Sequence, residues 1–531
     1  MKKIITIAFL FIVSLVLFAC DSTPKYTFEI EFENEKVLRE KLEFSLILHD
    51  ENDELKNSEV TGSLTKEGSK TPLSTKTINF SKETGKATLK FDGLTEGTTY
   101  TLRITTAFEG KEVTPVEKTY TTSLEGTEAN PYKISSFADF TNIVSSEPSA
   151  YFILTDNIDC GGKSFTPLFT STKGFKGNFN GNGKTISNFK ISSGDEENPY
   201  SSSSNENYGL FGYVAEGGEI YDLNLDTINI YVSRSARDSY LTTYGLLAGY
   251  NAGKISNIKV TNSSLNIKST TTTENKLVVG GLVGYLYGKG TVDNVEVKNT
   301  TINITAAKDA VVGGVVGSTL DAIKRTDKVN VNKAVFDGEI SVNISGSKSE
   351  KAETVIGGIV GENHKAVIDN SQSSGKITLK TSYTNVGAPK YVVGGLVGYN
   401  LNQIAEVKNS KSSVSFDVTV LNGPSSENNE VIINAGLLVG QNGVNADATS
   451  KINNCTYEYV EQSIIHVSEN TLIKYHLGLT GLNNSYSNGV SVVENSPSFS
   501  ILVQKYVLDE DTRDFVVSGD PVIGWIWGNL E

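Results

Sequence analysis

Hydrophobic and polar residues alternate along much of this chain, in short stretches separated by turn residues. Between residues 26 and 124 the alternating stretches include Tyr26–Phe32, Lys41–Leu48, Ala87–Phe91 and Tyr100–Ile104. Alternation with a period of two places one face of a β-strand on a core and the other face in water. About seven strands in about 100 residues is the size of a β-sandwich. We therefore predict a β-sandwich over residues 26–124.

Beyond residue 128 the pattern becomes a repeat that continues to residue 500. A short Gly-hydrophobic-Gly motif occurs eight times, starting at Gly209, Gly245, Gly281, Gly314, Gly358, Gly395, Gly436 and Gly478. Each repeat has room for three short strands, which cannot bury a face alone but form a continuous core when coils stack. The pattern predicts an all-β chain with a parallel, right-handed β-helix over residues 128–500. A propeller would need four strands and an aromatic signature in each repeat.

A second element, an aliphatic residue, any residue and then Asn, follows every Gly motif except the fourth, with Asp in place of Asn after the first motif, and an extra copy precedes the first motif. We expect its last residue to form a column along the stack, made of Asn188, Asp222, Asn257, Asn294, Asn370, Asn409, Asn454 and Asn495, with Lys333 in the fourth repeat. Stacked amides can donate and accept along the axis of the stack. We expect them to satisfy turn backbone groups that coil packing buries.

Both ends of the stack need a cover, because an exposed terminal coil is an open β-edge. Phe137, Phe140 and Val144 recur at helical spacing, so we predict a short amphipathic helix over Ser135–Ser146 that closes the first coil. Residues 501–531, which contain Trp525 and Trp527, are expected to cap the other end.

The first 20 residues have the pattern of a processing segment. Lys2 and Lys3 precede the mainly apolar stretch Ile4–Phe18 of 15 residues, which is shorter than the about 20 residues of a membrane span. The stretch runs into Leu17–Cys20, which resembles the bacterial lipobox. The resemblance implies a signal peptide over residues 1–19, acylation of Cys20 by chains such as palmitate, a linker over residues 20–25, and a lipid-anchored location on the extracytoplasmic side of a cell membrane or outer membrane.

Two further resemblances concern the two predicted domains. The segment Leu94–Leu102 is similar to the tyrosine corner of fibronectin type III domains, although the Trp usual in their core is absent. The Gly motifs resemble the GLUG motif of bacterial surface proteins, and the lead-in segments Gly126–Ile134 and Phe175–Ile186 resemble the entry segment of that family. The resemblance implies a β-helix on a bacterial surface.

Composition excludes several classes of function. The chain has 47 Lys and Arg against 61 Asp and Glu, a net charge of −14, which argues against a nucleic-acid binder. Its four His form no H-E-x-x-H motif, and its three Cys form no disulfide framework. We expect no metal site and no cofactor, and we expect Cys160 and Cys455 to be separate thiols, with Cys455 buried.

The carboxylates show no recurring pair of the kind that an enzymatic β-helix carries. Asp156 and Asp159 lie in the first coil, and Asp293 and Asp369 stand singly beside the Asn column. Since only six Arg occur in the chain, we expect no catalysis. The alternative is a carbohydrate-active β-helix enzyme, such as a polysaccharide lyase or hydrolase.

Tyrosine follows the closing Gly of four repeats, at Tyr213, Tyr250, Tyr285 and Tyr399. The first three belong to consecutive coils, which predicts a strip of rings. We interpret the strip as a candidate platform for a host or environmental glycan or matrix protein, with ordinary aromatic packing as the other interpretation. The polar insertions at residues 192–207, 269–276, 345–354 and 422–430 are the second candidate. The predicted function is a monomeric, lipid-anchored surface protein for adhesion or ligand binding.

Overall fold

The computed structural model describes residues 26–524, with gaps at 56, 143, 145–146, 171–173, 195–205, 235–240, 270–276, 308, 320–328, 345–351, 383–388, 403, 422–430, 444–449, 469–472, 484–485, 489–490, 493–500 and 509–514. The signal peptide, Cys20, the linker up to residue 25, Asn495, Trp525, Trp527 and most of the polar insertions lie outside the described residues. The chain divides into two compact units, Met1–Glu125 and Gly126–Glu531. No helix in the described ranges is long and apolar enough to cross a membrane.

The first unit consists of two antiparallel sheets. One has the order β1-β2-β5, formed by β1 (Glu29–Val37), β2 (Lys41–His49) and β5 (Lys86–Asp92). The other has the order β4-β3-β6-β7, formed by β4 (Ser74–Thr77), β3 (Thr61–Lys66), β6 (Thr99–Phe108) and β7 (Lys111–Thr121).

The core of this unit is formed by the alternating residues that the sequence pattern identifies. Phe44, Leu64 and Leu102 are fully buried within one hydrophobic cluster. The Tyr100 hydroxyl accepts a 2.9 Å hydrogen bond from the main-chain N–H of Thr95. This bond ties the start of β6 to the preceding turn.

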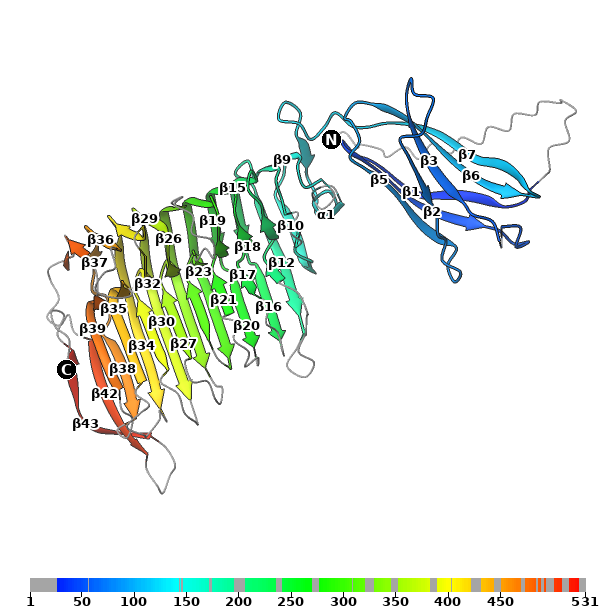
Figure 1. Cartoon of the computed structure of the whole chain (residues 1–531). Helices are drawn as coiled ribbons and strands as arrows, with labels where there is room; N and C mark the ends of the chain where they lie inside the picture. Colours follow the sequence, from blue (N-terminus) through cyan, green and yellow to red (C-terminus); the bar gives the residue numbers. More distant parts are fainter. Residues whose placement is uncertain are drawn as a thin grey trace, which may run out of the picture. The chain divides into compact units, whose positions relative to one another are not determined.

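The second unit is a parallel β-solenoid (Figure 1). Its 22-stranded sheet contains β8 (Tyr132–Ile134), β9 (Tyr151–Leu154), β10 (Ile158–Ser164), β11 (Asn178–Asn180), β12 (Thr185–Ser193), β15 (Glu219–Asp226), β16 (Asn229–Arg234), β19 (Lys254–Thr261), β20 (Ser264–Ser269), β23 (Thr291–Ala306), β26 (Val329–Ile344), β29 (Ala366–Asp369), β30 (Gln372–Ser382), β33 (Glu406–Lys408), β34 (Lys411–Leu421), β36 (Lys451–Asn453), β37 (Thr456–Tyr457), β38 (Ser463–Ser468), β40 (Tyr486–Asn488), β41 (Ser491–Val492), β42 (Ile501–Leu508) and β43 (Phe515–Gly524).

The 14-stranded sheet carries the Gly motifs, most of them at a bend between two short strands. It contains β13 (Glu206–Tyr208), β14 (Phe211–Val214), β17 (Thr242–Tyr244), β18 (Ala248–Asn251), β21 (Leu277–Gly280), β22 (Val283–Leu286), β24 (Ala310–Gly313), β25 (Val316–Ser318), β27 (Glu353–Gly357), β28 (Val360–Asn363), β31 (Lys390–Gly394), β32 (Val397–Asn400), β35 (Val431–Asn442) and β39 (Ile473–Asn483). Strands of successive coils pair in parallel, as β23 and β26 do over most of their length. The predicted parallel β-helix architecture is confirmed.

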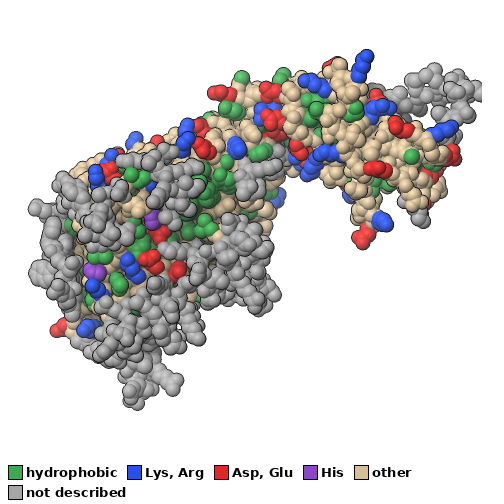
Figure 2. Space-filling view, in the orientation of Figure 1, with side chains coloured by type: hydrophobic (Ala, Val, Ile, Leu, Met, Phe, Trp, Pro, Cys, Tyr) green, Lys and Arg blue, Asp and Glu red, His purple; other side chains and the backbone are tan. Residues whose placement is uncertain are grey.

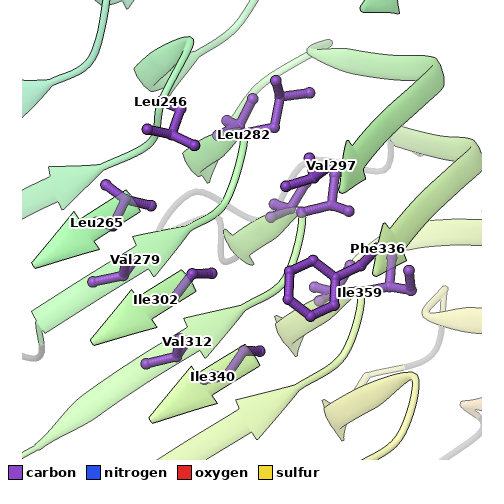
Figure 3. Close-up of a cluster of buried hydrophobic side chains, with 14 of the residues drawn as sticks. Leu246, Leu265, Val279, Leu282, Val297, Ile302, Val312, Phe336, Ile340 and Ile359 are labelled. Atoms are coloured by element: carbon purple, nitrogen blue, oxygen red, sulfur yellow. The ribbon is translucent and has the colours of Figure 1, made fainter. Parts of the chain in front are cut away.

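The interior of the solenoid is filled by aliphatic and aromatic side chains from both sheets. Figure 3 shows Leu282 and Ile359 at the Gly-motif bends facing the same cluster as Val297 and Phe336 of the 22-stranded sheet. All four side chains are buried. The hydrophobic residues of the repeat therefore face the interior at these positions.

The two glycines of each motif permit close contact between coils. A Cβ added to Gly281 would lie 2.0 Å from the carbonyl oxygen of Gly314 in the next coil. A Cβ added to Gly284 would lie 2.6 Å from the carbonyl oxygen of Gly249 in the preceding coil. A residue with a side chain at either of these glycine positions would push neighbouring coils apart.

The two ends of the stack differ in structure. Helix α1 (Phe137–Asn142) lies within the predicted helical segment but is shorter, with Phe140 buried and the Ser136 hydroxyl accepting a hydrogen bond from the N–H of Asp139 at 3.1 Å. At the other end, β42 pairs in parallel with β38, and β43 pairs with β42 in the antiparallel sense.

Candidate functional site

The predicted Asn column exists, but it lies on the outside of the solenoid. Its amides bond to one another, as Asn257 donates to Asp222 at 2.8 Å and Asn294 donates to Asn257 at 2.7 Å. Their side chains are exposed or half-exposed, at Asn188, Asp222, Asn257, Asn294, Asn370, Asn409 and Asn454. The expectation that they satisfy buried backbone groups is wrong.

The physical reason for Asn in this column is its backbone conformation. All seven residues and Lys333 have φ between 49° and 56°. This left-handed region is strained for most residues, and Asn and Asp tolerate it best after Gly. The column therefore marks a left-handed corner of each coil.

A second column of Asn residues performs the role that we expected of the first. Asn363, Asn400 and Asn442 are fully buried, and each donates to the next amide along the stack, Asn363 to Asn400 at 2.9 Å and Asn400 to Asn442 at 2.8 Å. Asn363 also accepts a hydrogen bond from the N–H of Ala366 and donates to the Ala366 carbonyl oxygen. The sequence signal that we missed is Asn two residues after the closing Gly, which occurs in five of the eight repeats at Asn251, Asn363, Asn400, Asn442 and Asn483.

Three of the four candidate tyrosines contact one another on the outer face of the 14-stranded sheet. The ring centroids of Tyr213 and Tyr250 are 5.0 Å apart, and those of Tyr250 and Tyr285 are 5.3 Å apart. Tyr287, which the sequence argument did not include, lies 5.4 Å from Tyr250. Tyr285 is only 7% exposed. Tyr213, Tyr250 and Tyr287 are half-exposed.

A lysine from two coils away contacts the same aromatic group. The Lys365 Nζ lies 5.5 Å from the centroid of the Tyr287 ring and donates to the carbonyl oxygen of Gly288 at 3.3 Å. Burial, with the nearby Tyr287 and Glu216, raises the pKa of Tyr213. The phenol of Tyr213 is therefore neutral at physiological pH.

The fourth tyrosine, Tyr399, belongs to a different environment, because Ser318 and Glu362 occupy its column in the two preceding coils. Its hydroxyl donates to a carboxylate oxygen of Glu353, and Lys390 lies 4.9 Å from the centroid of its ring. Burial, with the nearby Glu353 and Glu362, raises the pKa of Tyr399, so its phenol is a hydrogen-bond donor. Figure 2 shows hydrophobic, charged and histidine side chains together on one stretch of the solenoid surface.

Three of the four carboxylates considered for catalysis accept hydrogen bonds from Asn side chains of neighbouring coils, whereas Asp156 accepts from the adjacent Thr155 at 3.1 Å. Asp159 accepts from Asn188 at 2.9 Å, and Asp369 accepts from Asn409 at 2.9 Å. Asp293 accepts from an outward-facing Asn of the next coil at 2.6 Å. Across the part of the chain that the structure describes, no three His, Cys, Asp or Glu residues are placed to hold a metal ion.

The two cysteines of the described residues are free and buried. Burial raises the pKa of Cys160 to about 11 and the pKa of Cys455 to about 11. Both thiols are therefore protonated at neutral pH, as a structural rather than a reactive cysteine would be.

Comparison with known proteins supports the repeat assignment. The GLUG motif model matches residues 277–303 and 391–419. The chain is similar to a putative Gly-rich membrane protein of Evansella cellulosilytica, with 32% identity over 144 residues, and to halomucin of Haloquadratum walsbyi, with 29% identity over 170 residues. These matches cover 26% and 30% of this chain but only 15% and 2% of the two relatives. The prediction of GLUG repeats is confirmed: this chain carries GLUG repeats folded as a parallel β-solenoid, which suggests a surface-type repeat protein.

Proposed function

We propose that this protein is a lipid-anchored bacterial surface protein whose solenoid binds a glycan or a matrix protein without catalysing a reaction. The observation that carries the proposal is the coil register, because equivalent side chains of successive coils form continuous columns along the stack. A column repeats the same weak contact along a chain-like ligand, and repeated weak contacts sum to a useful avidity.

The anchor part of the proposal rests on the lipobox-like segment Leu17–Cys20. Two acyl chains on Cys20 would hold the protein on a membrane without a spanning helix. We expect Cys20→Ser to move the protein from the membrane fraction to the soluble fraction. Retention of the variant on membranes after a salt wash would refute the anchor.

The binding part is tested with the purified protein lacking its signal peptide. We expect retention on an array of polysaccharides and matrix proteins, with no change in the size of any soluble glycan after long incubation. Depolymerisation of a glycan would refute the non-catalytic function. A scan of Asp156, Asp159, Asp293 and Asp369 would then locate the site.

We further infer that the first unit is a fibronectin type III-like spacer and that the solenoid coils are right-handed, the hand that parallel crossovers almost always take. The strand orders β1-β2-β5 and β4-β3-β6-β7 and the bond between Tyr100 and Thr95 support the first inference. A spacer sets the distance between the membrane and the solenoid and makes no contact with the ligand. Deletion of residues 26–124 is therefore expected to leave ligand binding by the solenoid unchanged.

A further inference from the structure

A column of uncharged polar side chains runs along the outer face of the 22-stranded sheet. It contains one residue from each of β16, β20, β23, β26 and β30, and Figure 1 shows these strands succeeding one another along the stack. The parallel register places the five residues in line as Tyr231, Asn266, Asn303, Ser341 and Thr378. We call this set the amide-hydroxyl column.

The column is accessible and partly ordered by its own hydrogen bonds. Asn303 and Ser341 are exposed, and Tyr231, Asn266 and Thr378 are half-exposed. The side-chain amide of Asn303 donates to the side-chain oxygen of Asn266 at 2.9 Å, and the side-chain amide of Asn266 donates to the Ser264 hydroxyl at 3.2 Å. These bonds hold the Asn266 and Asn303 side chains in line before any ligand arrives.

The chemistry of the row matches a polyhydroxylated ligand. Amide and hydroxyl groups both donate and accept, as sugar hydroxyls do. Tyr231 offers an aromatic ring with a polar tip, which suits the apolar face and the hydroxyl edge of a sugar ring. None of the five residues is charged, and charged residues of both signs flank the column two positions away on the same strands, at Lys268, Glu339, Lys376 and Lys380.

The spacing of the row suits a polymer. Neighbouring strands lie about 4.8 Å apart, so five coils present five contacts over about 19 Å. A linear polysaccharide lying along the axis would meet an equivalent group at every coil. By contrast, the rings of Tyr213, Tyr250 and Tyr285 contact one another, and Tyr285 in the last of these three coils is buried.

We propose that the amide-hydroxyl column is the binding surface for a neutral linear polysaccharide. This proposal rests on the proposed non-catalytic function and assigns its ligand class and its location. The column ends at Asp417, which takes the next place in register and pairs with Lys376 at 3.6 Å. At the other end, Ser192 of β12 precedes Tyr231 in register, so the uncharged stretch is six coils long and the amide-hydroxyl column forms its last five.

The test compares two double variants on the same two coils. Asn303→Glu with Ser341→Glu places two carboxylates in the middle of the column. Thr291→Glu with Asn330→Glu places the same two carboxylates in register on another exposed stretch of β23 and β26. Circular dichroism and melting temperature show whether both variants keep the wild-type fold. The probes are immobilised cellulose, xylan and mannan, with polygalacturonate as the acidic comparison.

We expect the wild type to bind at least one neutral polysaccharide more tightly than polygalacturonate. The column variant should lose at least tenfold in affinity, and the control variant should lose less than twofold. Three results would overturn the proposal: no binding to any neutral polysaccharide, equal losses in both double variants, or binding that only a triple Ala variant of Tyr213, Tyr250 and Tyr285 removes. The Cys20→Ser fractionation tests the surface function separately, so failure of this proposal and of that function are distinguishable.

Discussion

The buried Asn column provides the sharpest test of how the coils hold together. Asn400 is fully buried, donates to Asn442 at 2.8 Å and to the Lys451 carbonyl oxygen at 3.1 Å, and accepts from Asn363 at 2.9 Å. The change Asn400→Ala removes all three bonds from the middle of the column. It also leaves a space the size of the amide group.

The expected loss of stability follows from the groups left behind. The buried Asn442 side-chain oxygen and the part-buried Lys451 carbonyl oxygen each lose a donor, and a buried polar group without its partner costs about 1–3 kcal/mol. Since Asn363 keeps its bond to the Ala366 carbonyl oxygen, its amide is not stranded. We therefore expect Asn400→Ala to lower the free energy of unfolding by about 2–4 kcal/mol.

The matched control is Asn294→Gly in the outer column. Asn294 is exposed, has φ of 52° and bonds to Asn257. Glycine keeps the left-handed conformation and loses only an exposed amide bond, so we expect a change within about 1 kcal/mol. Urea unfolding followed by circular dichroism measures both values, and hydrogen exchange shows whether the loss is confined to neighbouring coils. Equal destabilisation by the two changes, or a larger effect of Asn294→Gly, would refute the distinction between the columns.

Three further predictions concern other parts of the molecule. Gly281→Ala should destabilise the solenoid by at least about 2 kcal/mol, because its Cβ would meet a carbonyl of the next coil at 2.0 Å; a wild-type urea midpoint would contradict this packing. Tyr100→Phe should cost the first unit about 1 kcal/mol through the lost bond to the main chain, measured by the melting of that unit. Cys160 and Cys455, whose thiol pKa values burial raises to about 11, should not react with a thiol reagent at pH 8 until the protein unfolds, and rapid labelling of the native protein would disprove their burial.

The sequence predicted the architecture because repetition multiplies a weak local signal. Eight Gly motifs in phase locate the bends, and alternation locates the inward side chains, such as Val297 and Ile302. Both signals depend on short-range sterics and on burial. Neither depends on details of side-chain orientation.

The role of the Asn residues could not be assigned in the same way. Two different requirements select Asn, namely a left-handed backbone at Asn294 and a buried hydrogen-bonding amide at Asn400. The sequence shows the residue type, but not the φ angle or the side of the coil on which the amide lies. Frequency alone therefore assigns the buried hydrogen-bonding role to the outer Asn column, which is the wrong one.

The tyrosines show a similar limit. Their spacing predicted that Tyr213, Tyr250 and Tyr285 lie in line, and the parallel register places them so. It could not predict that Tyr287 and the distant Lys365 join the same group. Packing between coils decides whether a ring face is open to a ligand, and this depends on residues far away in the sequence.

The central claim is that coils stack in register, so that equivalent side chains form continuous columns. Cysteines introduced in pairs test this directly under mild oxidation. Asn303→Cys with Ser341→Cys places two thiols opposite each other on β23 and β26, about 4.8 Å apart between strands. Asn303→Cys with Asn343→Cys keeps the same face but shifts the pair to about 8 Å, too far for a disulfide. The account predicts a rapid disulfide in the first pair and none in the second, and preferential oxidation of the second pair would contradict the register.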